Sequence, residues 1–221
     1  MITFITRLFF SIALIISTPL IFAQGMMGGN GYGGGFGYGG YGMMGGRGFG
    51  SQNPNQLGLT RISLADAKND VQNYLKSTGN SGLAVEEVME FERNFYAIVK
   101  EVHPEHAAFE LLVNPYNGAV TPEPGPNMMW NTKYGPMGAG FGTNTGQMSV
   151  GVEQARQDAE SYLQTLGSGY TVEKRPDRFY GYYTMHILKN GKILGMLSVN
   201  GYTGQVWVHN WHGAYVKMES Y

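Results

Sequence analysis

Two pairs of histidines have the spacing of a metal site. His103 and His106 form one H-x-x-H pair, and His209 and His212 form the other. Two imidazoles three positions apart in a helix or tight turn can bind one ion, whereas in a strand they point to opposite faces. The second pair has Met218 nearby, which gives two nitrogen ligands and one sulfur ligand suited to copper. The alternative is a chance pairing, because no third histidine or acidic residue accompanies the pair in the sequence.

Two methionine pairs near the N-terminus are a second set of candidate metal ligands. They are Met26–Met27 and Met43–Met44, in a glycine-rich stretch that has no histidine or cysteine. Thioether sulfurs are soft ligands that suit Cu(I) or Ag(I), and an exported tail would meet such ions first. The alternative is a flexible linker whose aromatic side chains make weak contacts. The sequence therefore establishes no cofactor and leaves copper or zinc open.

Tryptophan and glutamate side chains are the candidates for binding a partner. Trp130 and Trp211 lie near the ends of the two halves of the chain, where a tryptophan forms either an exposed platform for a peptide or a cap on a small core. Residues 57–131, with five basic and ten acidic side chains, carry a formal charge of −5. We expect Glu86, Glu90 and Glu92 to share one side of a strand, as a binding edge or as a solvated face.

No catalytic motif is present in the sequence. H-E-x-x-H, G-x-S-x-G, P-loop and Rossmann patterns are all missing, and the absence of cysteine excludes thiolate chemistry. A formal net charge of −1 argues against a nucleic-acid-binding protein, which needs a concentrated basic surface. We therefore predict a protein without catalytic residues, and a hydrolase with an unfamiliar site is the weakest alternative.

The first 23 residues have the pattern of a signal peptide. Arg7 precedes the apolar run Leu8–Ile16, which Pro19 then ends, and Ala23 is a small residue at the expected cleavage point. A membrane-spanning helix needs about 20 apolar residues, so this run is too short. We expect an exported protein, periplasmic or extracellular, with no transmembrane anchor in its mature form. An uncleaved anchor helix is the alternative.

Composition divides the rest of the chain. Residues 24–56 are predicted to be a flexible Gly/Met/Tyr-rich tail, because 15 of the 34 glycines fall within residues 25–50. Two modules follow, at 57–131 and 147–221. A Gly/Pro/Asn-rich linker at 132–146 joins them.

The two modules repeat one pattern of elements. Each begins with an amphipathic helix, whose apolar positions at Leu64, Ala67, Val71, Tyr74 and Leu75 recur 88 residues later. Strand-like runs and turns follow each helix, and Asn190–Gly191 is a hairpin signal in the second module. The sequence thus predicts an α+β fold of two tandem modules, each with one helix packed on a small antiparallel sheet.

A V-N-x-Y-x-G-x-V pattern ends both repeats. It stands at Val113, Asn114, Tyr116, Gly118 and Val120, and again at Val199, Asn200, Tyr202, Gly204 and Val206. With the preceding helix and strands, it resembles the PepSY domain of secreted peptidase propeptides and YpeB-type spore-cortex regulators. The family usually has Asp where Asn114 and Asn200 stand here. The resemblance implies a non-catalytic module that binds or inhibits peptidases or makes other extracytoplasmic interactions.

These observations lead to one main hypothesis and one alternative. The main hypothesis is an exported, non-enzymatic interaction protein that binds an extracytoplasmic protein or peptide through sheet edges or the groove between the modules. The alternative is an envelope metal-handling protein that uses the methionine pairs and the His209/His212 pair. The sequence leaves the partner and the oligomeric state open.

Overall fold

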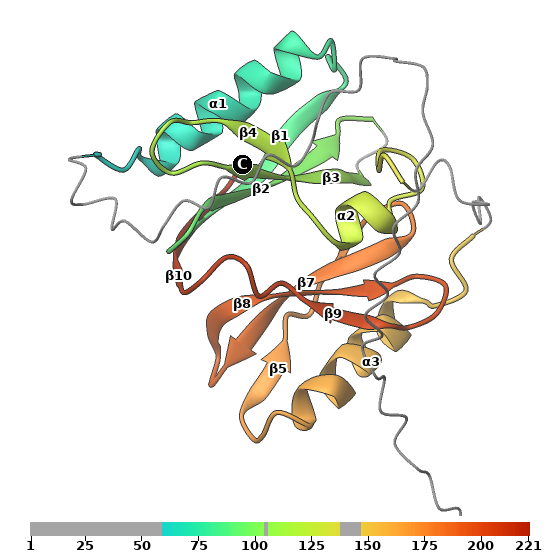
Figure 1. Cartoon of the computed structure of the whole chain (residues 1–221). Coiled ribbons are helices and arrows are strands. Elements are labelled where there is room, and N and C mark those ends of the chain that lie inside the picture. Colours follow the sequence, from blue (N-terminus) through green and yellow to red (C-terminus); the bar gives the residue numbers. More distant parts are fainter. Residues whose placement is uncertain (1–58, 104–105, 138–146) are drawn as a thin grey trace, which may run out of the picture. The chain divides into compact units, whose positions relative to one another are not determined.

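The computed structural model describes residues 59–103, 106–137 and 147–221, which form two antiparallel sheets and three helices (Figure 1). The predicted signal peptide at 1–23 and the predicted tail at 24–56, with its four methionines, lie outside the described residues. Within the described part, no helix has the length and apolar character needed to cross a membrane.

The strand order is β10–β1–β2–β3–β4 in the first sheet and β5–β7–β8–β9 in the second, where β6 also pairs with β7. The strands of the first sheet are β1 (Leu83–Phe91), β2 (Phe95–Glu101), β3 (His106–Val113), β4 (Val120–Pro122) and β10 (Tyr215–Ser220). Those of the second are β5 (Tyr170–Val172), β6 (Asp177–Arg178), β7 (Tyr182–Lys189), β8 (Lys192–Asn200) and β9 (Val206–Val208). The helices are α1 (Leu64–Ser77), α2 (Pro126–Met129) and α3 (Val152–Gln164).

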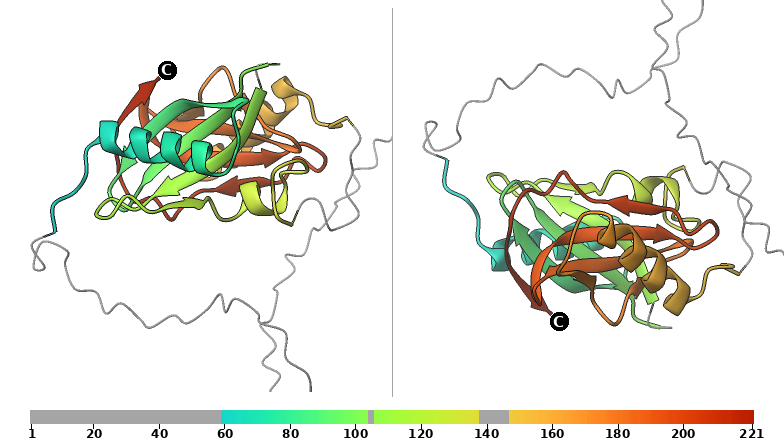
Figure 2. Two further views of the ribbon diagram at one scale, coloured as in Figure 1. Left: turned by 90° about the horizontal axis from the view of Figure 1, so that it is seen from above. Right: turned by 90° about the horizontal axis from the view of Figure 1, so that it is seen from below.

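Helices α1 and α3 form over the residues that have the amphipathic spacing. Ser63 caps α1 through a reciprocal capping box with Asp66, whereas α3 starts after Gly151 without a side-chain cap. Each helix buries one stripe of side chains, such as Val71 in α1 and Ala159 in α3. Figure 2 shows α1 over the first sheet from above and α3 over the second sheet from below.

The predicted fold class, an α+β protein of two helix-on-sheet modules, is wrong. The described residues are mostly β, in two sheets of five strands each with only a few short helices. The last strand, β10, comes from the second half of the chain but pairs with β1, from Glu87↔Ser220 to Phe91↔Tyr215. The second half of the chain therefore completes the first sheet and covers most of the edge of β1.

A core shared by both sheets is the physical reason for this architecture. Strand β2 is buried on both faces from Phe95 to Val99, as expected for a strand between two apolar layers. The fully buried members of the shared core are Met89, Phe91, Tyr96, Ile98, Phe179, Tyr182 and Met196. Each sheet is thus covered by a helix on one face and by the other sheet on the opposite face.

The repeated turns approach their helices in the same way. Gly118 and Gly204 both have a positive φ, 69° and 72°. A Cβ at Gly118 would collide with the carboxylate of Asp70 in α1, and one at Gly204 would lie 2.7 Å from Oδ2 of Asp158 in α3. Two features favour glycine at each of these positions: the positive φ and the close approach of the helix.

Candidate metal centre

Three buried side chains from both halves of the chain meet between the two sheets. Glu123 directly follows β4, and its backbone N–H donates to the carbonyl of Glu110 in β3. His209 directly follows β9, and its backbone N–H donates to the carbonyl of Met196 in β8. His212 lies three residues further, in the turn that leads toward β10. We name these three residues the Glu123–His209–His212 cluster.

The cluster brings two imidazole nitrogens to one carboxylate oxygen. Oε1 of Glu123 lies 3.2 Å from Nδ1 of His209 and 3.0 Å from Nε2 of His212. The exposed fractions of the three residues are 0, 4 and 1%. Within the described part of the chain, neither of these nitrogens nor Oε2 of Glu123 makes a hydrogen bond of acceptable geometry. Buried polar atoms without a partner are rare in proteins and call for an explanation.

A chain of hydrogen bonds determines which nitrogen of His209 carries the proton. The hydroxyl of Thr184 donates to Oε1 of Glu110 at 2.8 Å, so its oxygen is left to accept from Ser198, 2.8 Å away. Ser198 has then used its only proton and accepts from Nε2 of His209 at 2.9 Å. In the neutral form of His209 the proton therefore sits on Nε2, and Nδ1 presents its lone pair to Glu123.

Asn94 orients His212 so that its inner nitrogen also faces Glu123. Its Nδ1 lies 2.8 Å from Oδ1 of Asn94, which can only accept a hydrogen bond. The proton of neutral His212 therefore sits on Nδ1, and the lone pair of Nε2 faces Glu123. Both histidines thus have a polar partner on the outer nitrogen and an open donor atom on the inner one, which is the arrangement of metal-binding histidines.

The charges of the cluster are strongly coupled. Burial alone would raise the pKa of Glu123, but the neighbouring charge of His209 and the contacts with both histidines lower it well below its ordinary value. Burial lowers the pKa of His212. Burial raises the pKa of Glu110 to about 8, and the nearby charge of Glu123 adds to the effect. Burial alone would lower the pKa of His209, but the charge of Glu123 and the contact with its carboxylate raise it. The cluster therefore contains an ionised carboxylate beside a neutral His212, and a metal ion bound there would replace the proton that Glu123 favours on His209.

Aromatic rings surround the cluster. Trp211 stacks on His209, with ring centroids 4.8 Å apart, and donates from Nε1 to Oε1 of Glu123 at 3.2 Å. Phe91 stacks on His212 with ring centroids 4.5 Å apart. These contacts hold both imidazoles in place and exclude water, so electrostatic interactions inside the cluster are stronger than at the surface.

Two nitrogens and one carboxylate oxygen form a ligand set for a borderline metal ion. The three ligand atoms lie within 4.8 Å of one another. Zn(II) accepts histidine and carboxylate ligands, and imidazole and oxygen ligands also suit Cu(II). Softer Cu(I) favours thioether or thiolate ligands, which these three residues do not supply.

The structure unites only part of the predicted metal ligands. His209 and His212 lie together, in a loop where three-residue spacing does allow a common ion. Met218 lies in β10 opposite Met89 and packs against the shared core, outside the Glu123–His209–His212 cluster. The other candidates, Met26, Met27, Met43 and Met44, fall outside the described residues.

The tryptophans proposed as a platform make contacts inside the protein. Trp130 packs against the shared core and meets Trp207 of β9 edge-to-face, with ring centroids 5.6 Å apart. Trp211 is a neighbour of Glu123 and His209, as described above. Their role in binding a partner stays a prediction.

The three glutamates of the predicted acidic edge each make a separate contact within the protein. Glu90 pairs with Arg61 at 2.9 Å, and Glu86 lies 3.8 Å from the ammonium group of Lys100. Glu92 accepts a hydrogen bond from the backbone N–H of Ala214, in the loop before β10. The partner role of these three glutamates also stays a prediction.

Glu123 is the ligand that sequence reasoning missed. It lies ten residues after Val113, and His209 lies ten residues after Val199, so the two occupy equivalent positions in the repeats. Their equal distance from the two V-N-x-Y-x-G-x-V patterns is the signal that would have linked Glu123 to His209. The spacing of metal ligands in one segment does not reveal a ligand from the other repeat.

Comparisons with known proteins give little guidance. No family model matches the chain, and no curated protein matches it. The C-terminal domain of Bacillus megaterium YpeB is a weak structural neighbour, with 15% sequence identity and a TM-score of 0.33. The match covers 73% of this chain and 66% of that domain. The PepSY family thus stays a prediction from the sequence.

Proposed function

We propose that this protein binds one Zn(II) or Cu(II) ion at the Glu123–His209–His212 cluster. The observation that carries the proposal is the convergence of three buried nitrogen and oxygen atoms that have no hydrogen-bond partner of acceptable geometry in the described chain. The predicted export signal would expose the protein to metal ions of the cell envelope. This proposal corresponds to the envelope metal-handling hypothesis, with Glu123 in place of Met218 as the third ligand.

A simple ion pair explains the cluster less well than a metal ion does. A proton on His209 would satisfy one nitrogen, but Nε2 of His212 would still present a lone pair to Oε1 of Glu123 at 3.0 Å. Oε2 of Glu123 would also stay buried without a partner. One cation between the three residues interacts favourably with all of these atoms.

A bound ion would link the two sheets. Glu123 comes from the end of the first sheet, and both histidines follow the last strand of the second. Because the ligands are brought together only in the folded chain, binding stabilises the folded state. The sequence contains no cysteine, so an exported protein of this kind has no disulfide to serve the same purpose.

Calorimetric titration of residues 24–221 with Zn(II) and Cu(II) tests the proposal. We expect one ion per chain, and a loss of at least 100-fold in affinity for Glu123→Gln and His212→Gln, since each removes one of three ligands. His103→Gln is the matched control, because His103 is an exposed histidine outside the cluster. Circular dichroism verifies that each variant is folded. Wild-type binding no tighter than micromolar, or equal binding by the Glu123 and His212 variants, would contradict the proposal.

The main sequence hypothesis, an interaction protein, remains a second candidate function. A specific observation favours it, namely a groove beside the edge of the first sheet, which does not depend on the metal cluster. The non-catalytic role and the export of the protein stay predictions.

A further inference from the structure

The edge of β1 is only partly covered by β10. The ladder between the two strands runs from Phe91 to Glu87, and the backbone N–H of Tyr221 makes the last contact, with the carbonyl of Glu86 at 2.7 Å. Strand β1 itself starts four residues earlier, at Leu83. Among the described residues, no strand pairs with Leu83–Val85 on this side. The backbone N–H of Leu83 donates to the carbonyl of Asn80 at 3.2 Å, and the rest of this uncovered edge can pair with another chain.

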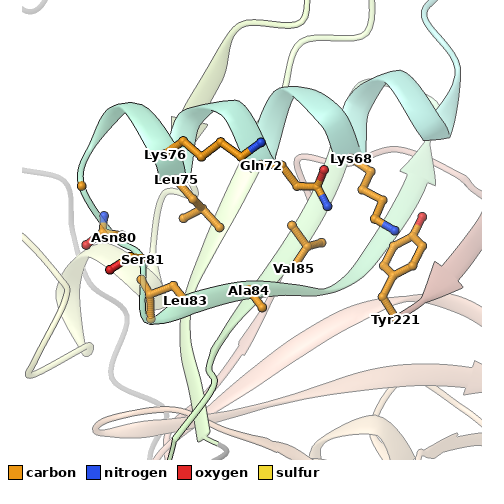
Figure 3. Close-up of a pocket in the computed structure, with 11 residues that line it drawn as sticks. Lys68, Gln72, Leu75, Lys76, Asn80, Ser81, Leu83, Ala84, Val85 and Tyr221 are labelled. Atoms are coloured by element: carbon orange, nitrogen blue, oxygen red, sulfur yellow. The ribbon is translucent and has the colours of Figure 1, made fainter.

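A groove of about 570 Å³ follows this uncovered edge. Figure 3 shows α1 along one side of the groove, β1 along the other and Tyr221 at one end. Leu75 and Val85 form its base, with exposed fractions of only 4 and 7%. An extended peptide placed here would meet a strand edge on one side and an apolar base below, which is the usual setting for strand addition.

The helical side of the groove is basic. Lys68, Gln72 and Lys76 are spaced four residues apart on α1, and no acidic residue lines the groove. Within the described chain, neither ammonium group lies within 4 Å of a carboxylate, and that of Lys68 instead lies 3.2 Å from the ring centroid of Tyr221. The groove therefore offers two positive charges that a negatively charged partner can neutralise.

The spacing of these side chains matches that of an extended strand. Four residues of a helix advance about 6 Å, and two residues of a strand advance about 6.7 Å. Alternate side chains of a peptide parallel to α1 would thus meet Lys68, Gln72 and Lys76 in turn. Acidic residues at every second or fourth position fit this rim.

We infer that the groove between α1 and β1 binds an acidic peptide segment in extended form. The peptide pairs antiparallel with Leu83–Val85, in line with β10 on the same edge of β1. The contacts with Lys68 and Lys76 select acidic side chains, and the strand edge selects an extended backbone. This inference goes beyond metal binding, because no residue of the groove belongs to the Glu123–His209–His212 cluster.

Fluorescence anisotropy with labelled peptides tests the inference on residues 24–221 in the presence of EDTA. The probe is an eight-residue peptide of alternating valine and glutamate. Two further probes have the same length: one with lysine in place of glutamate, and one with N-methyl groups on alternate backbone nitrogens. We expect the acidic peptide to bind, and both other peptides to bind at least tenfold more weakly.

Matched variants locate the binding site. Lys68→Glu/Lys76→Glu should weaken binding of the acidic peptide at least tenfold, and Lys68→Gln/Lys76→Gln should weaken it in the same direction but less. The control Lys174→Glu/Lys192→Glu makes the same charge change at exposed positions of the other half of the chain and should leave binding unchanged. Thermal unfolding verifies that all variants are folded. No binding below 1 mM, equal binding of the N-methylated or the lysine peptide, or full binding by Lys68→Glu/Lys76→Glu would overturn the inference.

Discussion

Two groups of histidine and carboxylate side chains link the sheets, and they satisfy their histidines in different ways. In the first group, His186 of β7 faces a carboxylate at each ring nitrogen. Its Nε2 lies 3.1 Å from Glu87 of β1, and its Nδ1 lies 3.0 Å from Glu173, next to β5. Burial alone would lower the pKa of His186, but the hydrogen bonds with Glu173 and Glu87 raise it to about 10. This group holds a proton on each ring nitrogen.

The Glu123–His209–His212 cluster has the opposite arrangement. The outer nitrogens of its histidines bond to neutral groups, Ser198 and Asn94, and two inner nitrogens share a single carboxylate. The comparison indicates that two carboxylates hold a proton on both nitrogens of His186, whereas the neutral outer partners in the cluster leave the inner nitrogens available to a cation. We therefore assign a proton to the His186 group and propose a metal ion for the cluster.

The largest expected effect follows from removal of His186. In His186→Ala, the buried Glu87 and the half-buried Glu173 lose their shared positive charge, and we expect the free energy of unfolding at pH 7 to fall by about 3–5 kcal/mol. Denaturant unfolding measures this loss. The metal affinity of the folded variant should stay unchanged, because His186 lies outside the cluster. A loss below about 1 kcal/mol would show that His186 is not a buried, charged partner.

The pH dependence of stability sharpens the same comparison. The folded state holds the proton of His186 up to about pH 10, whereas the unfolded chain releases it near pH 6.5. Stability from this group is therefore complete below about pH 6.5 and is lost as pH rises toward 10, on the order of 5 kcal/mol in total. Burial and the nearby charges of Glu173, Glu87 and Glu86 raise the pKa of Asp177 to about 8, which acts in the same direction up to that pH.

Denaturant unfolding between pH 7 and pH 10 measures this slope. In His186→Gln, the contributions of Asp177 and Glu110, whose pKa values are both raised to about 8, should remain, so stability should level off between pH 8 and pH 10. A wild-type protein whose stability does not fall over this interval would contradict the proton assignment for the His186 group.

The smallest expected effect concerns the outer partner of His209. Ser198→Ala removes the acceptor that holds the proton on Nε2, while the three proposed ligands are retained. Replacement of such a partner lowers metal affinity by about 10–100-fold. Thr203→Ala is the control, a hydroxyl removed from an exposed turn. Calorimetry on folded protein decides the matter, and an unchanged affinity would mean that Ser198 does not orient His209.

Local patterns in the sequence predicted some elements well. The apolar spacing of α1 and α3 is a property of one continuous segment, so both helices form where that spacing occurs. One of the strand-like runs of the second module, at residues 178–188, is interrupted between β6 and β7, where Gly181 has a φ of 103°. A glycine in a strand pattern permits such a break without requiring it.

Long-range pairing accounts for what the sequence did not reveal. The contact between Glu87 and Ser220 joins residues 133 positions apart, and nothing in either local segment indicates the other. The same holds for Glu123 and His209, which approach only because the two sheets share one core. The two histidines of the cluster were predictable from their spacing, whereas the carboxylate required the fold.

Electron paramagnetic resonance of Cu(II) bound to residues 24–221 tests the central claim most directly. We predict one Cu(II) per chain, with couplings from two imidazole nitrogens in the wild type and from one in His212→Gln. Glu123→Gln should change the spectrum by removing the oxygen ligand, and the exposed-site control His103→Gln should leave it unaltered. A wild-type spectrum with no imidazole nitrogen, or one that His212→Gln leaves unchanged, would contradict metal binding at the Glu123–His209–His212 cluster.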